Sequence, residues 1–268
     1  MLSIVIPTLN EEGNIRHLIP AIIDFFSCRG IEIVVLDGHS TDGTQAVVKE
    51  FSRKYPCVRL VVQSGRGFAS ALAQGLNAAK GDIIVTMDAE NHLPSEIPRL
   101  VNELKRGGFD VVVGSRFMKG ADVDLARKRF LSSKIANEIA KVALKLNVLD
   151  CSSGFRAYRA QAVREATRNL RTKYFSVQVE LLEKIRKNGG TLGEIPVHYL
   201  KREEGKSKFR FKTAVRDATT LLKIARDNEI EDLKAKSRRI VNGLKSKTKK
   251  PSIPEKAKIL WKKQGFKD

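Results

Sequence analysis

The sequence predicts an α/β fold built on a doubly wound, mostly parallel sheet. Short runs rich in β-branched residues alternate with longer segments whose apolar residues recur at helical spacing. The short runs are apolar at consecutive positions, as is typical of strands buried on both faces. Strands and helices in this order are joined by right-handed crossovers, so we expect ligands to bind beyond the carboxyl ends of the strands.

The first half of the chain has the clearest pattern. Strands are predicted at residues 3–7, 32–37, 58–62, 82–88 and 110–114, with helices between them at residues 14–28, 42–55, 67–80 and 95–107. Asp42 and Ser95 are of the residue types that favour N-caps, and they precede two of these helices. Gly30, Gly81 and Gly107 stand where helices are expected to end.

The second half is less regular. An amphipathic helix is predicted from about residue 125 to 146, with an apolar side formed by Phe130, Leu131, Ile135, Ile139, Val142 and Leu146. A helix near residues 176–188, a strand at 191–200, a basic loop at 201–212 and a helix to about residue 230 follow. We therefore expect a domain at residues 1–230 and a basic tail at residues 231–268, partly helical and suited to a membrane surface.

The chain is strongly basic, with a formal net charge of +20. The tail contributes +9 of this charge, since residues 231–268 hold 13 Lys or Arg and 4 Asp or Glu. Nucleic acid, anionic lipid and phosphorylated substrates all suit such a surface. Aromatic residues make up only 6% of the chain and most lie in apolar runs, which argues against a protein that stacks on nucleic-acid bases.

Cysteine usage and hydropathy bear on the compartment. Cys28, Cys57 and Cys151 are far apart and form no CxxC pair, which predicts neither a disulfide framework nor a zinc site. No cationic leader precedes the first strand, and no window reaches the roughly 18 consecutive apolar residues of a membrane span. We expect a cytoplasmic protein in a reducing compartment that contacts membranes only peripherally.

The segment VTMDAENHLP ends a predicted strand with carboxylates at Asp88 and Glu90, followed by His92. Hard oxygen donors at the ligand edge of a sheet suit Mg²⁺ or Mn²⁺ bridging a diphosphate. The alternative is a polar turn that caps the next helix, and for the pair alone this alternative is favoured about three to one. For His92, metal ligation and packing in the turn are equally supported.

Two more polar segments follow neighbouring strands and favour a ligand crevice. VIPTLNEEGNI follows the first strand, and LDGHSTDGT follows the second, where Asp37 is suited to accept hydrogen bonds from a base or ribose. GRGFAS is only a weak match to a dinucleotide fingerprint, because its third glycine is missing. His17, His39 and His198 are interpreted as surface or packing residues.

The chain resembles the family 2 glycosyltransferases of GT-A fold. The resemblance rests on the segments above and on five further motifs, which occur in the family's order: GRGFASALAQGLNAAKGDIIVTMDAE, VVVGSRF, RKRFLSSKIAN, SSGFRAYR and GKSKF. Within that family the chain is most similar to the dolichyl-phosphate mannose synthases, or polyprenyl-phosphate mannosyltransferases. The resemblance covers roughly residues 2–210. It implies an inverting, metal-dependent transferase that moves mannose from GDP-mannose to a polyprenyl phosphate.

The resemblance also implies roles for individual residues. It implies that the nucleotide is bound by Pro7, Thr8, Glu11 and Asp37. It implies that the metal and the donor diphosphate are bound by Asp88, Ala89, Glu90 and His92. It assigns the acceptor phosphate to Arg116, Arg129 and Ser133, and a loop that closes over the donor to Arg202, Ser207 and Lys208. Asp88, Arg116, Arg129, Arg202 and Lys208 are the expected catalytic set.

Four positions depart from the family pattern. Gly38 and His39 stand where the family carries an Asp-Gly pair, so one carboxylate near the nucleotide is missing. Leu9 replaces a tyrosine that would stack on the base, and Glu90 replaces an aspartate. The longer side chain of Glu90 alters the distance at which it could reach a metal.

Other functions remain open at this point. The same fold could use UDP-glucose or another sugar nucleotide, or a non-lipid acceptor, and a basic nucleic-acid-binding protein is a more remote alternative. An anionic membrane surface and a separate membrane-anchoring protein are further candidate partners, whereas nucleic acid is not favoured.

Overall fold

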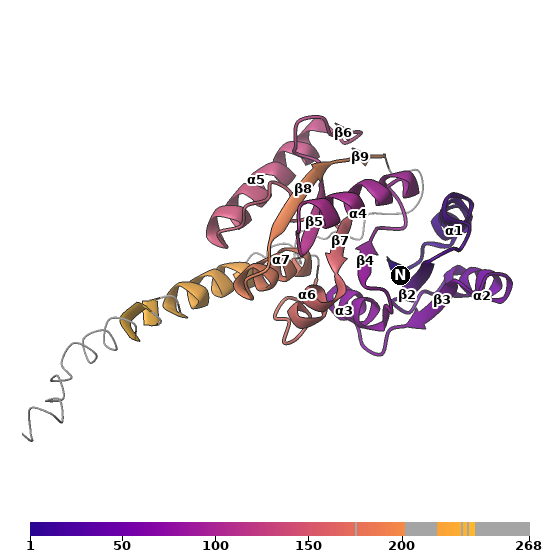
Figure 1. The fold of residues 1–268 in the computed structure, drawn as a ribbon, viewed down its shortest axis with the longest axis horizontal. Coiled ribbons are helices and arrows are strands. Elements are labelled where there is room, and N and C mark those ends of the chain that lie inside the picture. Colours follow the sequence, from indigo (N-terminus) through magenta and orange to yellow (C-terminus); the bar gives the residue numbers. More distant parts are fainter. Residues whose placement is uncertain (175, 202–218, 232, 235, 239–268) are drawn as a thin grey trace, which may run out of the picture. The chain divides into compact units, whose positions relative to one another are not determined.

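A computed structural model of the protein describes residues 1–174, 176–201, 219–231, 233–234 and 236–238. The chain divides into two compact units, residues 1–223 and 224–268. The first unit is built on a seven-stranded sheet of order β3-β2-β1-β4-β7-β5-β8, next to a two-stranded sheet of β6 and β9 (Figure 1). The predicted α/β class is confirmed; the predicted domain boundary at residue 230 stays a prediction.

All five strands predicted in the first half are present, within two residues at each end. The elements are β1 (Leu2–Thr8), α1 (Glu12–Phe26), β2 (Ile31–Asp37), α2 (Thr44–Lys54), β3 (Val58–Val62), α3 (Phe68–Ala78), β4 (Ile83–Thr86), a 3₁₀ turn η1 (Pro94–Glu96), α4 (Ile97–Arg106) and β5 (Val111–Ser115). β1 pairs in parallel with β2 and with β4. The carboxyl ends of these three strands therefore meet at one edge of the sheet, as expected.

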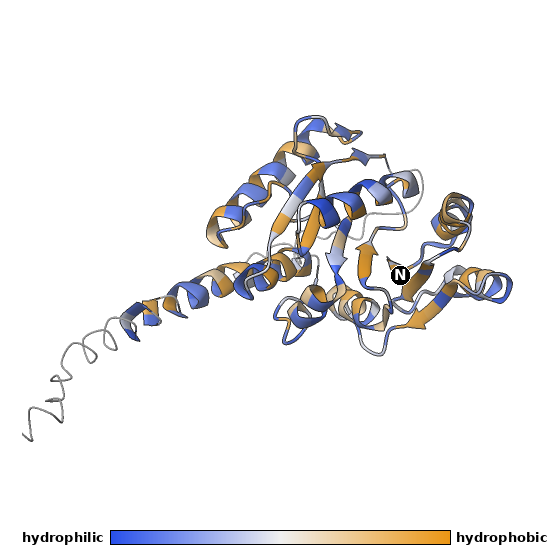
Figure 2. Ribbon diagram, in the orientation of Figure 1, coloured by the Kyte–Doolittle hydropathy of each residue, from blue (hydrophilic) through white to orange (hydrophobic). Residues whose placement is uncertain are grey.

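The second half contains a strand that the hydropathy pattern does not reveal. Its elements are β6 (Asp122–Val123), α5 (Arg127–Ala143), β7 (Arg156–Arg159), α6 (Ala160–Ala166), α7 (Val177–Lys187), β8 (Leu192–Pro196) and β9 (His198–Tyr199). β7 has the sequence RAYR and is blue to white in Figure 2, where β4 is orange. It runs antiparallel between β4 and β5. Because β7 is reversed, the loop that precedes it lies at the carboxyl edge of its neighbours.

Helices cover both faces of the sheet. Ile4 and Ile6 of β1 belong to a buried cluster that includes apolar residues of α1, α2 and α4. On the other face α3 contacts β1 and β2, and α6 contacts α3 and α7. A Cβ at Gly75 of α3 would lie 2.7 Å from Val5 Cγ1, so only glycine lets this helix come so close to β1.

Two details of the helices differ from expectation. Ser95 lies inside η1 and makes no side-chain cap, so its predicted N-cap role is wrong. Asp42 precedes α2 by two residues, yet its Oδ1 accepts the Thr44 N–H at 2.9 Å, which satisfies one of the free amides of that helix start.

Helix α5 (Arg127–Ala143) lies within the span predicted for the amphipathic helix. Leu131, Ile135, Ile139 and Val142 are each more than half exposed, so the apolar side predicted for this helix does not pack into the core. Only the two flanking members are sheltered, since the Phe130 ring lies 5.3 Å from that of Phe117 and Leu146 is buried beyond the helix end.

Cys28 and Cys57 form a disulfide, which the sequence analysis did not anticipate. They are 29 residues apart, with β2 between them, and the crossover returns the chain so that their Cα atoms lie 5.7 Å apart. Spacing in the sequence carries no sign of this pairing, which depends on the tertiary fold. Among the described helices, none is long and apolar enough to cross a membrane.

Candidate active site

The loops that follow β1 and β2 are tied together by hydrogen bonds. The Asn10 N–H donates to Ser40 Oγ at 2.8 Å, and Asn10 Oδ1 accepts from the Thr41 N–H at 2.7 Å. The Gly43 N–H donates to Glu12 Oε2 at 3.0 Å. The two polar segments that the sequence placed at neighbouring strand ends therefore form one joined wall of the crevice.

Asp37 at the end of β2 is fully buried and has one carboxylate oxygen unsatisfied. Its Oδ2 accepts from the Ser40 N–H at 3.0 Å and from Gln45 Nε2 at 2.7 Å. Its Oδ1 has no hydrogen-bond partner among the described residues. A buried polar atom without a partner is costly, so this oxygen is suited to accept a hydrogen bond from a ligand.

The other predicted nucleotide residues lie beside Asp37. Pro7 and Thr8 end β1, and Thr8 pairs with Asp37 in the sheet register. The Thr8 hydroxyl donates to the Leu36 carbonyl at 3.2 Å, and Glu11 Oε2 accepts from Asn14 Nδ2 at 2.7 Å. These side chains shape the wall, and Leu9, where the family has tyrosine, is exposed.

Asp88 lies two residues beyond β4, at the same edge, and its side chain is 45% exposed. A Cβ at Gly154 would come within 3.1 Å of Asp88 Oδ1. The absence of a side chain at Gly154 therefore lets the loop before β7 pass directly beside the carboxylate while leaving it open to solvent.

His92 is buried next to Asp88, with its Nε2 3.8 Å from Asp88 Oδ2. Its ring stacks on Phe155 at 4.6 Å and meets the Tyr199 ring edge-on at 5.6 Å, while Nδ1 has no hydrogen-bond partner among the described residues. The imidazole is thus both packed in an aromatic cluster and adjacent to the carboxylate. Ala89 is buried in the core cluster, so its side chain faces away from the crevice.

The donor set at this edge fits a hard divalent cation that a diphosphate helps to hold. Within the described part of the chain, no three His, Cys, Asp or Glu side chains gather as a ready-made metal cage. Mg²⁺ is usually bound by one or two carboxylates together with water and substrate phosphates, so a cage is not required. The exposed carboxylate of Asp88, with Glu90 and His92 following it in the sequence, can supply the protein ligands of such a cation.

Arg116 follows β5 directly and is held by a carboxylate that the sequence analysis missed. Its Nε and Nη2 donate to the two oxygens of buried Asp150 at 2.7 and 2.8 Å, and Nη2 also donates to Ser152 Oγ at 2.8 Å. Burial lowers the pKa of Arg116, but Asp150 and, more weakly, Asp88 raise it, and the net result is a raised pKa. The guanidinium is therefore a fixed positive charge within electrostatic reach of Asp88.

Tyr199 is a second residue that the sequence analysis missed. Arg116 Cζ lies 5.3 Å from the centre of its ring, and pairing of β9 with β6 fixes its backbone. Burial raises the pKa of the Tyr199 hydroxyl, with Arg116 opposing and Asp88 adding to the shift, so the group stays protonated and can donate. The sequence analysis placed Tyr199 inside the strand predicted at residues 191–200, so nothing in the sequence marked it as a residue of the site.

Arg129 and Ser133 lie on α5, where Arg129 is exposed. Arg129 lines a cavity of about 440 Å³ together with Tyr199, Lys201 and Asn91. The structure thus places Tyr199 and Asp88 near Arg116, and Arg129 and Tyr199 line the same cavity. Arg202, Ser207 and Lys208 lie outside the described residues.

A comparison with known protein families identifies the group to which this chain belongs. The sequence profile described as glycosyl transferase family 2 matches residues 3–167. The chain belongs to glycosyl transferase family 2. Its α/β architecture with a mostly parallel central sheet matches the GT-A fold of this family, so the expected fold is confirmed.

Two named proteins are similar to this family 2 chain over most of its length. It is 34% identical over 216 residues to a dolichol-phosphate mannosyltransferase of Pyrococcus furiosus, covering 79% of this chain but only 60% of that protein. It is 29% identical over 213 residues to a polyprenol monophosphomannose synthase of Mycolicibacterium smegmatis, covering 76% of this chain and 79% of that protein.

Solved structures confirm the fold. A glucosyl-3-phosphoglycerate synthase of Mycobacterium tuberculosis, in complex with Mn²⁺, UDP and phosphoglyceric acid, superposes with a TM-score of 0.65. The sequence identity is 21%, and the match covers 84% of this chain and 78% of that one. At this identity the similarity shows that the two proteins share a fold and nothing about a shared activity.

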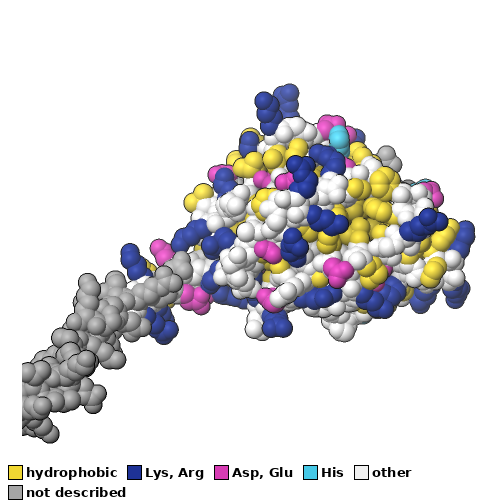
Figure 3. Space-filling model, in the orientation of Figure 1, with side chains coloured by type: hydrophobic (Ala, Val, Ile, Leu, Met, Phe, Trp, Pro, Cys, Tyr) yellow, Lys and Arg dark blue, Asp and Glu magenta, His cyan; other side chains and the backbone are white. Residues whose placement is uncertain are grey.

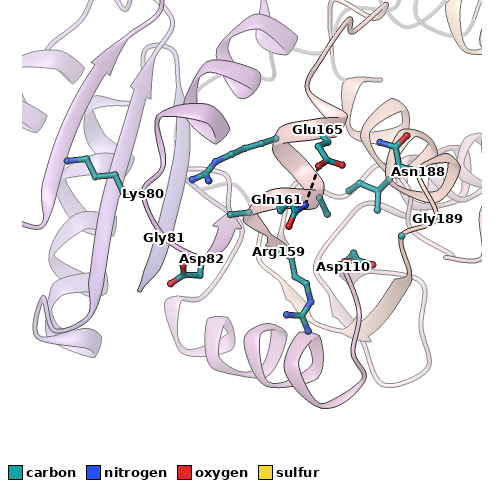
Figure 4. A pocket seen from close by; sticks show the side chains of 14 residues that line it. Lys80, Gly81, Asp82, Asp110, Arg159, Gln161, Glu165, Asn188 and Gly189 are labelled. Carbon is teal, nitrogen blue, oxygen red and sulfur yellow. Dashed lines mark hydrogen bonds between the residues drawn. The ribbon is translucent and has the colours of Figure 1, made fainter.

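A larger cavity of about 580 Å³ lies at the opposite edge of the family 2 sheet, near the starts of β4 and β5 (Figure 4). Three of its charged groups are already bonded within the protein. Asp82 accepts from the terminal ammonium of Met1 at 2.9 Å, Asp110 accepts the Thr191 N–H at 2.9 Å, and Arg159 Nε donates to the Phe109 carbonyl at 3.0 Å. Ligands of doubly wound sheets bind at the carboxyl edge, so the candidate active site is the one at the Asp88 edge.

Proposed function

We propose that the protein is an inverting glycosyltransferase that moves mannose from GDP-mannose to a polyprenyl (dolichyl) phosphate at the cytoplasmic face of the membrane. The observation that carries this proposal is the partly exposed carboxylate of Asp88 within electrostatic reach of the fixed cation of Arg116 at one sheet edge. Such a site suits a reaction between two anions. The names of the Pyrococcus and Mycolicibacterium relatives support the mannose and the polyprenyl phosphate.

On the donor side, the unsatisfied Oδ1 of Asp37 is proposed to accept a hydrogen bond from the nucleoside, with Pro7, Thr8 and Glu11 forming the wall. Asp88, with Glu90 and His92, is proposed to hold Mg²⁺ or Mn²⁺. When bound, the cation neutralises charge on the departing nucleoside diphosphate. Arg202, Ser207 and Lys208 are proposed to close over the same diphosphate.

On the acceptor side, Arg116, Arg129 and Ser133 are proposed to bind the phosphate of the lipid. A phosphate monoester has a second pKa of about 6, so it is largely dianionic near neutral pH and requires no strong catalytic base. The chain's task is to hold this anion in line with the anomeric carbon against repulsion from the diphosphate. Fixed cations such as Arg116 perform that task without reorganising during the reaction.

Helix α5 is proposed to bring the enzyme to an anionic membrane. The side chains of Leu131, Ile135, Ile139 and Val142 recur every three or four residues and are all exposed. The helix also holds five Lys or Arg and one Glu, a net charge of +4. Figure 3 shows apolar and basic side chains side by side over the region of α5. Each well-placed cation adds about 1 kcal/mol to binding of anionic lipid.

Replacing Ile135 and Ile139 with serine is expected to reduce flotation of the protein with anionic vesicles several-fold, because both side chains are exposed and would insert into the interface. The matched control is Val62→Ser, an exposed apolar residue on the edge strand β3, which should float like the wild type. Deleting residues 231–268 tests the tail in the same assay. Unchanged flotation of the Ile135/Ile139 variant would refute the role of α5.

The proposed reaction is tested by incubating the protein with radiolabelled sugar nucleotides, polyprenyl phosphate and Mg²⁺ or Mn²⁺. Label from GDP-mannose is expected in the organic phase. Label from UDP-glucose, or transfer to a water-soluble phosphate alone, would favour those alternatives within the same fold. Absence of any lipid-linked product with every donor would overturn the proposal, and salt-sensitive RNA binding would then favour the nucleic-acid alternative.

A further inference from the structure

Helix α5 is attached to the rest of its unit mainly through one polar side chain. Asn137, at 3% exposure, is the only buried residue among the seventeen of α5. The large apolar side chains of Leu131, Ile135, Ile139 and Val142 are exposed, and Phe130 near the helix start is half-buried. The position of the helix is therefore set less by apolar packing than by the hydrogen bonds of Asn137.

Both ends of the Asn137 amide are used. Nδ2 donates to the Ser133 carbonyl and to Ser152 Oγ, each at 2.9 Å. Oδ1 accepts from the Ser152 N–H at 2.9 Å and from Cys151 Sγ at 3.1 Å. Burial raises the pKa of the Cys151 thiol to about 12, so it remains protonated and can donate. A side chain that both donates and accepts is required here, which selects asparagine over aspartate.

Ser152 passes the link on to Arg116. Its Oγ accepts from Arg116 Nη2 at 2.8 Å and donates to Asp150 Oδ1 at 3.2 Å. A continuous chain of hydrogen bonds thus runs from α5 through Asn137 and Ser152 to Arg116. Arg129 is on α5 and Arg116 follows β5, so this chain of hydrogen bonds connects the elements that carry the two arginines.

We propose that Asn137 is a positioning residue for the acceptor: it locks α5 onto Ser152 and so holds Arg129 in a fixed place relative to Arg116. This inference rests on the proposed function, in which both arginines bind the acceptor phosphate. The donor residues are outside the network, since Thr8, Asp37 and Asp88 belong to β1, β2 and the loop after β4. Loss of Asn137 should therefore affect the acceptor and spare the donor.

The first test is Asn137→Asp, which keeps the shape, removes the donor and adds a negative charge near Asp150. The KM for polyprenyl phosphate is expected to rise about tenfold, the size of one lost buried hydrogen bond. The KM for the sugar nucleotide and its slow hydrolysis by water should stay at wild-type values. The control is Glu138→Gln, an equally small change at the next position, where the side chain is exposed, and it should alter neither KM.

The second test is Ser152→Ala. Ser152 is exposed, and this substitution introduces no charge. It should give the same effect on the acceptor alone, and the double variant should be no worse than the poorer single one, because both changes break one link. Additive effects, or equal rises in both KM values, would overturn the inference while leaving the proposed function intact. If Asn137→Asp does not fold, a wild-type acceptor KM in Ser152→Ala overturns it equally. A wild-type protein that transfers no sugar to lipid would overturn both.

Discussion

Asp88→Asn is expected to lower metal-dependent sugar transfer by about three orders of magnitude, since a cation held at this position supplies several kcal/mol of charge stabilisation. Asparagine has the same shape but lacks the charge. Because the side chain is 45% exposed and lies outside the strands, the melting temperature should not change. Initial rates at saturating donor, with Mg²⁺ or Mn²⁺ and with EDTA, measure the effect.

Glu90→Asp is the matched control for this variant. It shortens the side chain and restores the aspartate that the family pattern carries, so activity should be retained or increased. Full activity of Asp88→Asn, or of the wild type in EDTA, would mean that the carboxylates serve the turn after β4 instead of a metal.

Asp150→Ala is expected to cost about 3–5 kcal/mol of the free energy of unfolding, because it leaves the guanidinium of Arg116 buried without its partner. Asp150 is fully buried and makes both charge-assisted bonds to Arg116. Urea denaturation measures the loss. The control is Glu138→Ala, which removes the exposed partner of Lys141, a pair at 2.7 Å that should be worth less than about 1 kcal/mol. Equal losses in the two variants would contradict this account.

The same pair gives stability a defined dependence on pH. Burial raises the pKa of the Asp150 carboxyl, but the hydrogen bonds and charge of Arg116 more than offset this, and the pKa lies below its usual value. A carboxyl whose pKa is lowered by folding adds stability above its unfolded pKa of about 4 and loses it as pH falls. The wild type should therefore lose stability below about pH 4 more steeply than Asp150→Ala.

The donor half of the site could be predicted from the sequence because it is built from consecutive strand ends. Apolar runs located β1, β2 and β4, and polar residues placed directly after them had to share an edge. The acceptor half could not be predicted in this way. β7 begins and ends with arginine, so hydropathy does not mark this segment as a strand. Arg156 is nevertheless buried, and its guanidinium donates hydrogen bonds to the Gln178 and Cys151 carbonyls.

Asp150 and Tyr199 were missed for a related reason. Each acts through a partner distant in sequence, Arg116 in both cases, and no local spacing reports such a contact. The apolar side of α5 was found correctly as a pattern, but helical periodicity alone does not distinguish a face that packs on the core from one that remains exposed. The pairing of Cys28 with Cys57 likewise depends on where the crossover returns the chain.

The reversed strand β7 also has a consequence for the order in which the protein can fold. The nucleotide-binding wall is complete once the chain has reached α2, because its hydrogen bonds join the loops after β1 and β2. The acceptor half requires segments from β5 to β9, closed by a strand that inserts between two others. Contacts of long sequence separation form late, since their loop-closure entropy must be offset first. The nucleotide-binding wall is therefore expected to form during synthesis before the site that receives the lipid.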